Sequence, residues 1–386
     1  MSFKKTCEVL SGGKRIGCKI SGGVLRPALT PVLKKASSLP AFIFAGYSAG
    51  NDCYFACDEK YVYFSADGLT FEHVGELAGN SPFIVEDIHG GKPRAVLING
   101  ERAASYADGN ISFFTYGAKL SCGVMHCGRL FGADADDGLK LVWSGEGGVD
   151  DWTENSGSLI LDPDRGEILG ILTFGGKIIA VRKYGLTVLN MYGSPENFSV
   201  AITDTDTDEI YKGTAKVAGG ILIFLTKGGL CSFDGARINV IGGDIFPLGC
   251  AESCFDKYFL PCREGTLCYD TGDGESFIID MRPDALCAGK QIYGYTTEGA
   301  YGFGNGLYKF ESERLNFGVG GKKTVTKIFV DGIATVEISN GNTARVFRSA
   351  EGIIRPNLRG ENFIVTVTGS LPLKGVTATA EVMNAI

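Results

Sequence analysis

Three histidines are the side chains best suited to proton transfer near neutral pH. They are His73, His89 and His126, and no two of them are neighbours in the sequence. A Ser-His-Asp triad needs a histidine that is held by a carboxylate beside a nucleophile, and spacing alone does not exclude this arrangement. Histidines on the surface or within a packed core are the favoured interpretation, so we assign no catalytic residue.

Cysteines could supply metal ligands or disulfides. They are Cys7, Cys18, Cys53, Cys57, Cys122, Cys127, Cys231, Cys250, Cys254, Cys262, Cys268 and Cys287. The pairs Cys53/Cys57 and Cys250/Cys254 have C-x-x-x-C spacing, and a Cys/His group lies at 122–127. A structural zinc site takes four nitrogen or sulfur ligands, whereas residues i and i+4 of a strand simply face the same side. We favour packed, reduced thiols, with zinc as the alternative, and name no metal ligand.

Two acidic runs could bind a hard cation through carboxylate oxygens. The runs are Asp134/Asp136/Asp137 and Asp204/Asp206/Asp208/Glu209. Their spacing is similar to the start of a calcium loop, but the glycine at the sixth position and the bidentate glutamate of an EF-hand are missing. Solvated loops between strands are the favoured interpretation, and a calcium site is the alternative.

Paired carboxylates could also serve a glycosidase. The segment Ser65–Phe71 resembles the Asp-box turn of sialidase-like propellers. In those folds the box pins a hairpin and lies outside the active site, so the resemblance implies a structural turn. The arginines of this sequence form no motif that we can assign to a substrate carboxylate, and a glycoside hydrolase is therefore an alternative only.

The elements that would position these side chains are β-hairpins. In Gly175–Gly193 an apolar run is followed by a break at Tyr184-Gly185 and then by a second apolar run. This pattern is typical of a hairpin, which on its own is only marginally stable in water. The same pattern occurs at Asp52–Gly68, Arg94–Asn110, Gly128–Gly147, Gly219–Gly235, Asp256–Gly274 and Gln291–Gly306.

The hairpins repeat at roughly 40 residues, the period of a β-propeller with four strands per blade. Their central turns are predicted at Lys60, Glu101, Gly138, Gly185, Gly229, Gly265 and Gly299. A β-sandwich would be less regular, and a β-helix would have a much shorter repeat. We therefore predict an all-β propeller of six or seven blades.

Three segments follow from where the repeat begins and ends. Residues 1–39 are predicted to be an N-terminal arm, 40–323 the β-propeller, and 324–386 a small C-terminal β-strand module. The last segment has longer alternating runs and a locally basic character. Its arginines are Arg345, Arg348, Arg355 and Arg359.

Composition agrees with an all-β chain and limits the partners. The chain has 386 residues, of which 56 are glycine, and a formal charge of −7. No stretch approaches the roughly 20 apolar residues of a membrane span, and residues 1–10 lack the apolar stretch of a secretory signal. An acidic chain without a basic cluster is poorly suited to gripping a phosphate backbone, but an acidic passage would let DNA slide.

One segment carries a more specific resemblance. Leu141–Trp152, with its Trp-Ser-Gly-Glu-Gly-Gly-Val-Asp-Asp-Trp run, is followed by the glycine-rich strand pattern of 166–182. With the strand-like end at 357–367, this pattern resembles the neck and tail-nozzle propellers of short-tailed phages, the hub or DNA-stabilisation proteins. The resemblance covers roughly Trp143 to the C-terminus.

The resemblance implies a structural virion protein, assembled in the host cytoplasm, and no enzyme. Such a protein would form a homo-oligomeric ring, with a hexamer as one stoichiometry, below the portal and adaptor. Packaged DNA would pass through or be sealed in its lumen without sequence-specific binding, and no cofactor is implied. A carbohydrate-binding or glycosidase-like propeller and a protein-interaction propeller of a bacterial host are the alternatives.

Overall fold

The computed structural model describes residues 2–21, 23–153, 155–201 and 205–383. The chain forms two compact units, and each is described by itself. The propeller unit comprises residues 33–263 and 282–302, and the second unit comprises 1–32, 264–281 and 303–386. Apart from the short 3₁₀ turns η1 (Pro163–Arg165) and η2 (Pro195–Asn197), the regular structure of the described residues is strand. The all-β prediction is confirmed.

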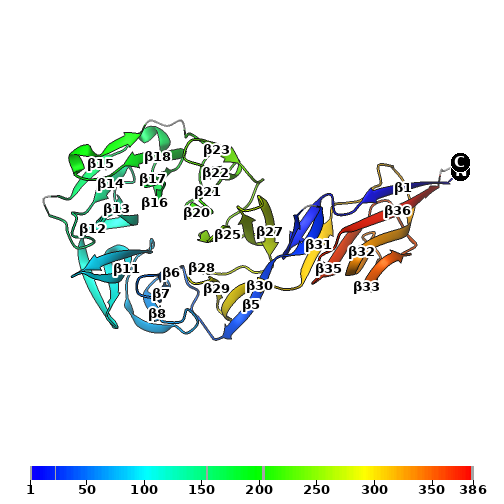
Figure 1. Cartoon of the computed structure of the whole chain (residues 1–386), viewed down its shortest axis with the longest axis horizontal. Helices are drawn as coiled ribbons and strands as arrows, with labels where there is room; N and C mark the ends of the chain where they lie inside the picture. Colours follow the sequence, from blue (N-terminus) through cyan, green and yellow to red (C-terminus); the bar gives the residue numbers. More distant parts are fainter. Residues whose placement is uncertain (1, 22, 154, 202–204, 384–386) are drawn as a thin grey trace. The chain divides into compact units, whose positions relative to one another are not determined.

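Sheets of mostly antiparallel strands follow one another through the propeller unit (Figure 1). The first is β6 (Phe44–Ser48), β7 (Cys53–Cys57), β8 (Tyr61–Ser65) and β9 (Glu72–Glu76). The second is β10 (Phe83–His89), β11 (Lys92–Ala107), β12 (Asn110–His126), β13 (Arg129–Asp134), β14 (Lys140–Trp143) and β15 (Gly157–Ile160). The third is β16 (Ile168–Phe174), β17 (Lys177–Arg182), β18 (Gly185–Asn190) and β19 (Ser199–Ala201).

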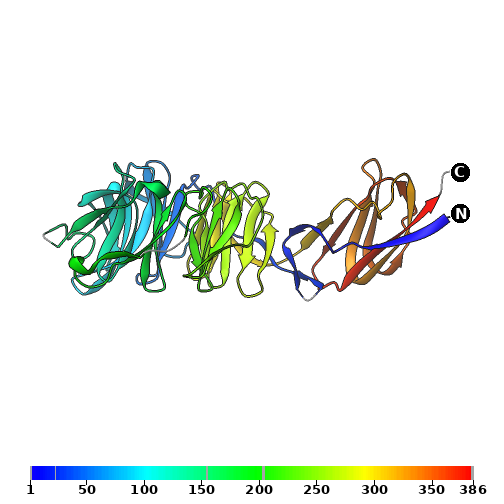
Figure 2. The same cartoon turned by 90° about the horizontal axis from the view of Figure 1, so that it is seen from above.

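Two further sheets complete the set. The fourth is β20 (Lys216–Ala218), β21 (Ile221–Thr226), β22 (Gly229–Phe233) and β23 (Ile238–Val240). The fifth is β28 (Ala285–Ala288), β29 (Ile292–Thr296) and β30 (Gly299–Asn305), completed by β5 (Leu29–Ala36) from the start of the chain. The hairpin β24 (Glu252–Cys254) and β25 (Lys257–Cys262) also belongs to this unit. Figure 2 shows the same sheets from another side.

Strand β17 shows why these sheets are stable only side by side. Its alternate residues Ile178 and Ala180 pack against Phe131 and other residues of the preceding sheet. The residues between them, such as Ile179, pack with Phe224 of the following sheet. Because both faces of the strand are buried, its sequence is a continuous apolar run and not a strict alternation of apolar and polar residues.

The predicted number of six or seven blades is wrong, because the described residues form five blades. Two predicted hairpins, at 94–110 and 128–147, lie within the single six-stranded sheet β10–β15. The turn expected at Glu101 is an irregularity inside the long strand β11, where the pairing register shifts between Gly100 and Arg102. A bulge and a tight turn both use a glycine at positive φ, so their sequence signals are alike.

The second unit joins the two ends of the chain. Its main sheet contains β1 (Ser2–Glu8), β36 (Gly375–Met383), β32 (Lys323–Ser339), β35 (Ile364–Gly369), β31 (Tyr308–Ser312), β2 (Gly13–Ile16), β27 (Glu275–Ile279) and β26 (Gly265–Asp270). Strands β33 (Ala344–Ile354) and β34 (Leu358–Gly360) also pair with β32, and β3 (Cys18–Ser21) pairs with β4 (Val24–Pro27). Its core contains Leu25, Ile328, Val336, Val365 and Val376, all fully buried.

This unit differs from the predicted arm at 1–39 and module at 324–386. Strand β1 pairs with β36 from Ser2 opposite Met383 to Glu8 opposite Thr377, so the first residues are part of a sheet. Strand β5 belongs to the fifth propeller sheet instead. Pairing between the two ends of a chain has no signal in local sequence patterns, and the predicted boundaries could not reflect it. No helix in the described ranges is long and apolar enough to cross a membrane.

Candidate functional site

The three histidines have separate surroundings. His73 packs edge-on against the rings of Tyr61 and Tyr63. His126 has a buried Nε2 that meets no hydrogen-bond partner among the described residues, and burial lowers its pKa. His89 is exposed, with its Nδ1 3.5 Å from Oδ2 of Asp150. The structure does not bring them together.

A Gly-x-Ser-x-Gly sequence at 46–50 is a nucleophile signal that our sequence analysis missed. The structure places Ser48 at the end of β6, before the turn to β7 and not before a helix. Its hydroxyl is fully buried and donates to Oε1 of Glu86, at 2.9 Å, and the backbone N–H of Gly50 donates to the same oxygen. Ser48 therefore helps to bind the turn between β6 and β7 to Glu86 of the neighbouring sheet. Because it is buried, its hydroxyl is out of reach of a substrate.

All twelve cysteines are free thiols. Burial raises the pKa of Cys53 and Cys57, at the two ends of β7, to about 12, which disfavours their thiolate forms. Within the described parts of the chain, no group of three or more His, Cys, Asp or Glu side chains could hold a metal ion.

The acidic runs serve turns and ion pairs. Asp134 accepts the backbone N–H groups of Asp136 and Asp137 and pairs with Lys140. In the second run, Glu209 pairs with Lys227 at 2.6 Å. Asp206 pairs with Arg165, and Asp204 lies outside the described residues.

The Asp-box resemblance agrees with a structural turn. Oδ1 of Asp67 accepts the backbone N–H groups of Leu69 and Thr70, each at 2.8 Å. The Ser65 hydroxyl accepts the N–H of Gly68, which also supports the connection from β8 to β9. The prediction that the box pins a hairpin is confirmed.

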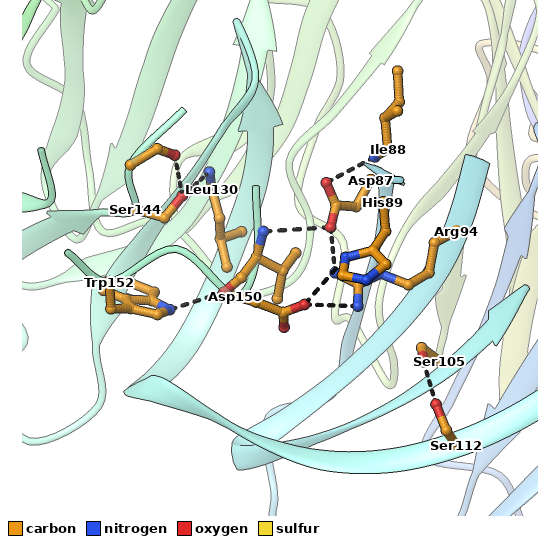
Figure 3. A network of polar contacts seen from close by, with 12 residues as sticks. Asp87, Ile88, His89, Arg94, Ser105, Ser112, Leu130, Ser144, Asp150 and Trp152 are labelled. Atoms are coloured by element: carbon orange, nitrogen blue, oxygen red, sulfur yellow. Dashed lines mark hydrogen bonds and ion pairs between the residues drawn. The ribbon is translucent and has the colours of Figure 1, made fainter. Parts of the chain in front are cut away.

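A buried arginine anchors the segment that carries the phage resemblance (Figure 3). Arg94 donates through Nη2 to Oδ2 of Asp87, at 2.5 Å, and through Nη1 to Oδ2 of Asp150, at 2.8 Å. Asp87 also accepts the backbone N–H of Val149. A second arginine, Arg129, donates to the carbonyls of Ser144 and Asn155. Both guanidiniums hold residues of the connection after β14 in place, so the Trp143–Trp152 run has a structural explanation within this chain.

A cavity of about 480 Å³ opens beside the third propeller sheet. Its walls come from the connection between β15 and β16, the turn between β17 and β18, and the connection between β19 and β20. Its lining includes Asp162, Asp164, Arg165, Arg182, Tyr184, Thr187 and Val200. No sequence pattern had indicated it, because its walls are brought together from three separate connections.

Arg182 forms the floor of this cavity and is 1% exposed. Its Nε donates to the carbonyl of Gly166 at 2.8 Å, and Nη2 donates to the carbonyls of Gly166 and Asp162. Among the described residues, Nη1 has one hydrogen-bond partner, the Thr187 hydroxyl, at 3.5 Å. Burial and the nearby Arg165 charge lower the pKa of Arg182, but an arginine stays protonated at neutral pH.

A second cavity, of about 320 Å³, lies between the third and fourth sheets. Lys216 on its wall pairs with Glu252 at 2.7 Å, and the remaining lining is largely apolar. Its lining also includes Thr173, Tyr211 and Ser253, but its one lysine is already paired with Glu252, so this cavity is less suited to an anionic ligand than the first.

A basic, partly apolar surface lies on the edge strand β33 of the second unit. Arg345, Arg348 and Arg355 are exposed, and none of them forms an ion pair with another described residue. Strand β33 pairs only with β32, where Phe329 and Ile353 face each other and are 42% and 47% exposed. An unpaired strand edge with exposed apolar side chains is a template for association, and charges limit which partner can use it.

Comparison with solved structures identifies β-propellers of low sequence identity. The extracellular domain of a hybrid two component system from B. thetaiotaomicron matches 89% of this chain and 57% of that chain, with 9% identity and a TM-score of 0.51. The Cps50 (Swd1) β-propeller domain of Myceliophteria thermophila matches 71% of this chain and 99% of that chain, with 10% identity and a TM-score of 0.49. At these identities the likeness shows the propeller fold alone. No protein family and no curated protein matches the sequence.

Proposed function

We propose that this protein is a structural assembly protein that acts as a ring of several copies, as in a phage neck or tail nozzle that conducts or seals packaged DNA. The observation that carries the proposal is the separation of charge between the two units. The propeller unit contains 21 Lys/Arg and 31 Asp/Glu residues, a formal charge of −10. The second unit contains 16 and 13, a formal charge of +3.

Because the two units have opposite charges, the acidic propeller unit of one copy should bind the basic second unit of another copy. The second unit also offers the β33 edge, with arginines that form no ion pair with another described residue and an exposed Phe329/Ile353 pair. A head-to-tail contact of this kind generates a closed ring when its rotation closes. The sequence resemblance of Leu141–Trp152 to nozzle propellers supports the same proposal.

Light scattering of the full chain tests assembly directly. We expect a mass of several copies at low ionic strength and a smaller mass at roughly 0.5 M salt, because salt screens contacts between exposed charges. The double variant Arg345→Glu/Arg348→Glu should shift the equilibrium toward the 41.0 kDa monomer.

A matched control is Lys5→Glu/Arg26→Glu, which makes the same change of charge at exposed positions on β1 and β4. It should leave the mass much closer to that of the unmodified chain. A monomer under all salt conditions, or equal loss of mass in both double variants, would contradict assembly through the β33 edge.

A further inference from the structure

The propeller blades offer an internal comparison for the buried Arg182. Arg182 ends β17 and pairs with Gly185, the first residue of β18. The residues that pair in the same way with the opening glycines of β22 and β30 are Thr226 and Thr296. The strand pairing at this position is therefore compatible with a threonine and does not itself require a guanidinium.

No described residue forms a direct ion pair with Arg182. Its bonds go to backbone carbonyls and to the Thr187 hydroxyl. The charge of the nearby Asp162 carboxylate opposes the fall in the pKa of Arg182, but the two side chains form no direct ion pair. A buried cation without a direct ionic contact is costly, and a bound anion would relieve that cost. The floor of the cavity presents two donors side by side, Nη1 of Arg182 and the hydroxyl of Thr187.

The walls of the cavity carry both apolar side chains and a hydrogen-bond acceptor, which suit a cyclic ligand with one apolar face and several hydroxyl groups. Tyr184 and Val200 line the cavity and are 42% and 46% exposed. Lys183 lies over the Tyr184 ring with its Nζ 5.5 Å from the centroid, which restricts the orientation of that ring. Asp164 lines the same space and offers a carboxylate that accepts hydroxyl protons. The volume lies within the range of small-molecule pockets.

We propose that this cavity binds an acidic saccharide, a sugar ring that carries a carboxylate. The carboxylate would accept from Nη1 of Arg182 and from the Thr187 hydroxyl. The apolar face of the ring would pack on Tyr184 and Val200, and ring hydroxyls would donate to Asp164. The site lies wholly within the propeller unit and is independent of the β33 edge proposed for assembly.

Saturation-transfer NMR on the full chain tests this site, with glucuronate, galacturonate and N-acetylneuraminate as probes. We expect saturable binding of at least one acidic sugar, no binding of glucose, and only weak competition by acetate, which lacks the ring. Thr187→Val removes the hydroxyl but keeps the side-chain shape, and it should weaken binding by roughly tenfold or more, as expected for a lost bond to a charged group.

Two variants separate binding from folding. Thr187→Ser keeps the hydroxyl and should retain binding. Arg182→Thr copies the residue of the neighbouring blades, so it should still unfold cooperatively, at a lower melting temperature because the carbonyls of Gly166 and Asp162 lose their donor, and it should bind no acidic sugar. The proposal is overturned if none of the three acidic sugars binds saturably, if glucose or acetate binds equally well, or if Thr187→Val binds like the unmodified chain.

Discussion

Buried arginines are the side chains that organise the loops of this propeller. Arg94, Arg129 and Arg182 are each at most 7% exposed. A guanidinium carries five N–H donors in one plane, so a single side chain can satisfy several loop carbonyls or carboxylates at once. Arg94 and Arg129 do this for the described residues of the connection after β14, where they bind Asp87, Asp150 and backbone oxygens. Arg182 differs because its hydrogen bonds to described residues go to backbone carbonyls and a hydroxyl, and because it borders a cavity.

Asp67 is a residue whose charge should stabilise its turn in a pH-dependent way. Burial raises its pKa, but the N–H groups of Thr70 and Leu69 and the Ser65 hydroxyl outweigh this effect, so the pKa is lowered overall. A lowered pKa means stability that is present above pH 3.8 and is lost as the pH falls through the folded-state pKa.

Asp67→Asn should therefore reduce the free energy of unfolding by about 1 kcal/mol at pH 7, a value kept small because the side chain is exposed. Urea unfolding at pH 7 and near pH 2 measures the difference. We expect the difference from the unmodified chain to shrink at low pH. A constant difference across this range would mean that the charge of Asp67 plays no part.

At the scale of elements, several hairpins of the propeller unit have a glycine as the first residue of their second strand, as β18 and β22 do. Gly185 and Gly229 have φ of +151° and +125°. A Cβ on Gly185 would lie 2.6 Å from the carbonyl oxygen of Thr205, and a Cβ on Gly229 would lie 2.4 Å from that of Gly242. The segment that follows the last strand of the blade therefore passes directly over the glycine, at Thr205 in one case and at Gly242 in the other. This close approach explains why a glycine occurs at both positions.

Gly185→Ala should destabilise the propeller by about 2 kcal/mol or more, because both the backbone conformation and the space exclude a side chain. The control is Gly170→Ala in β16, where the nearest atom, Cβ of Val181, is 4.0 Å from the added Cβ. Thermal unfolding of both variants measures the contrast. Equal melting temperatures for the two would refute the close approach at Gly185.

At the scale of the whole molecule, the two ends of the chain support one sheet. Strand β1 covers the edge of β36, and Val9 follows it into the core of the second unit. A sheet edge that loses its partner exposes backbone groups and becomes prone to pairing with other chains.

Deletion of residues 1–8 should therefore loosen β36 without a direct effect on the five propeller sheets. Amide hydrogen exchange of residues 376–382 should become faster, while exchange in β17 and β21 stays as in the full chain. The same deletion should increase aggregation at high protein concentration. Unchanged protection of β36 would show that its pairing with β32 alone is sufficient.

The sequence by itself determined the class of fold. Apolar runs separated by glycine turns at a period near 40 residues indicate hairpins that must pack against one another, and this physical requirement leads to a propeller. The local contacts of the Asp box and the hairpin at Gly175–Gly193 were also predictable. Each depends on hydrogen bonds between residues that are close in the sequence, such as Asp67 and Thr70.

Only the tertiary structure decided the number of blades, the composition of the second unit and the candidate sites. The bulge at Gly100 and the turn at Gly185 look alike in sequence, but one continues a strand and the other reverses it. The pairing of β1 with β36 and the walls of the Arg182 cavity join residues that are distant along the chain. Such contacts depend on how whole sheets pack, and no local pattern of residue types encodes them.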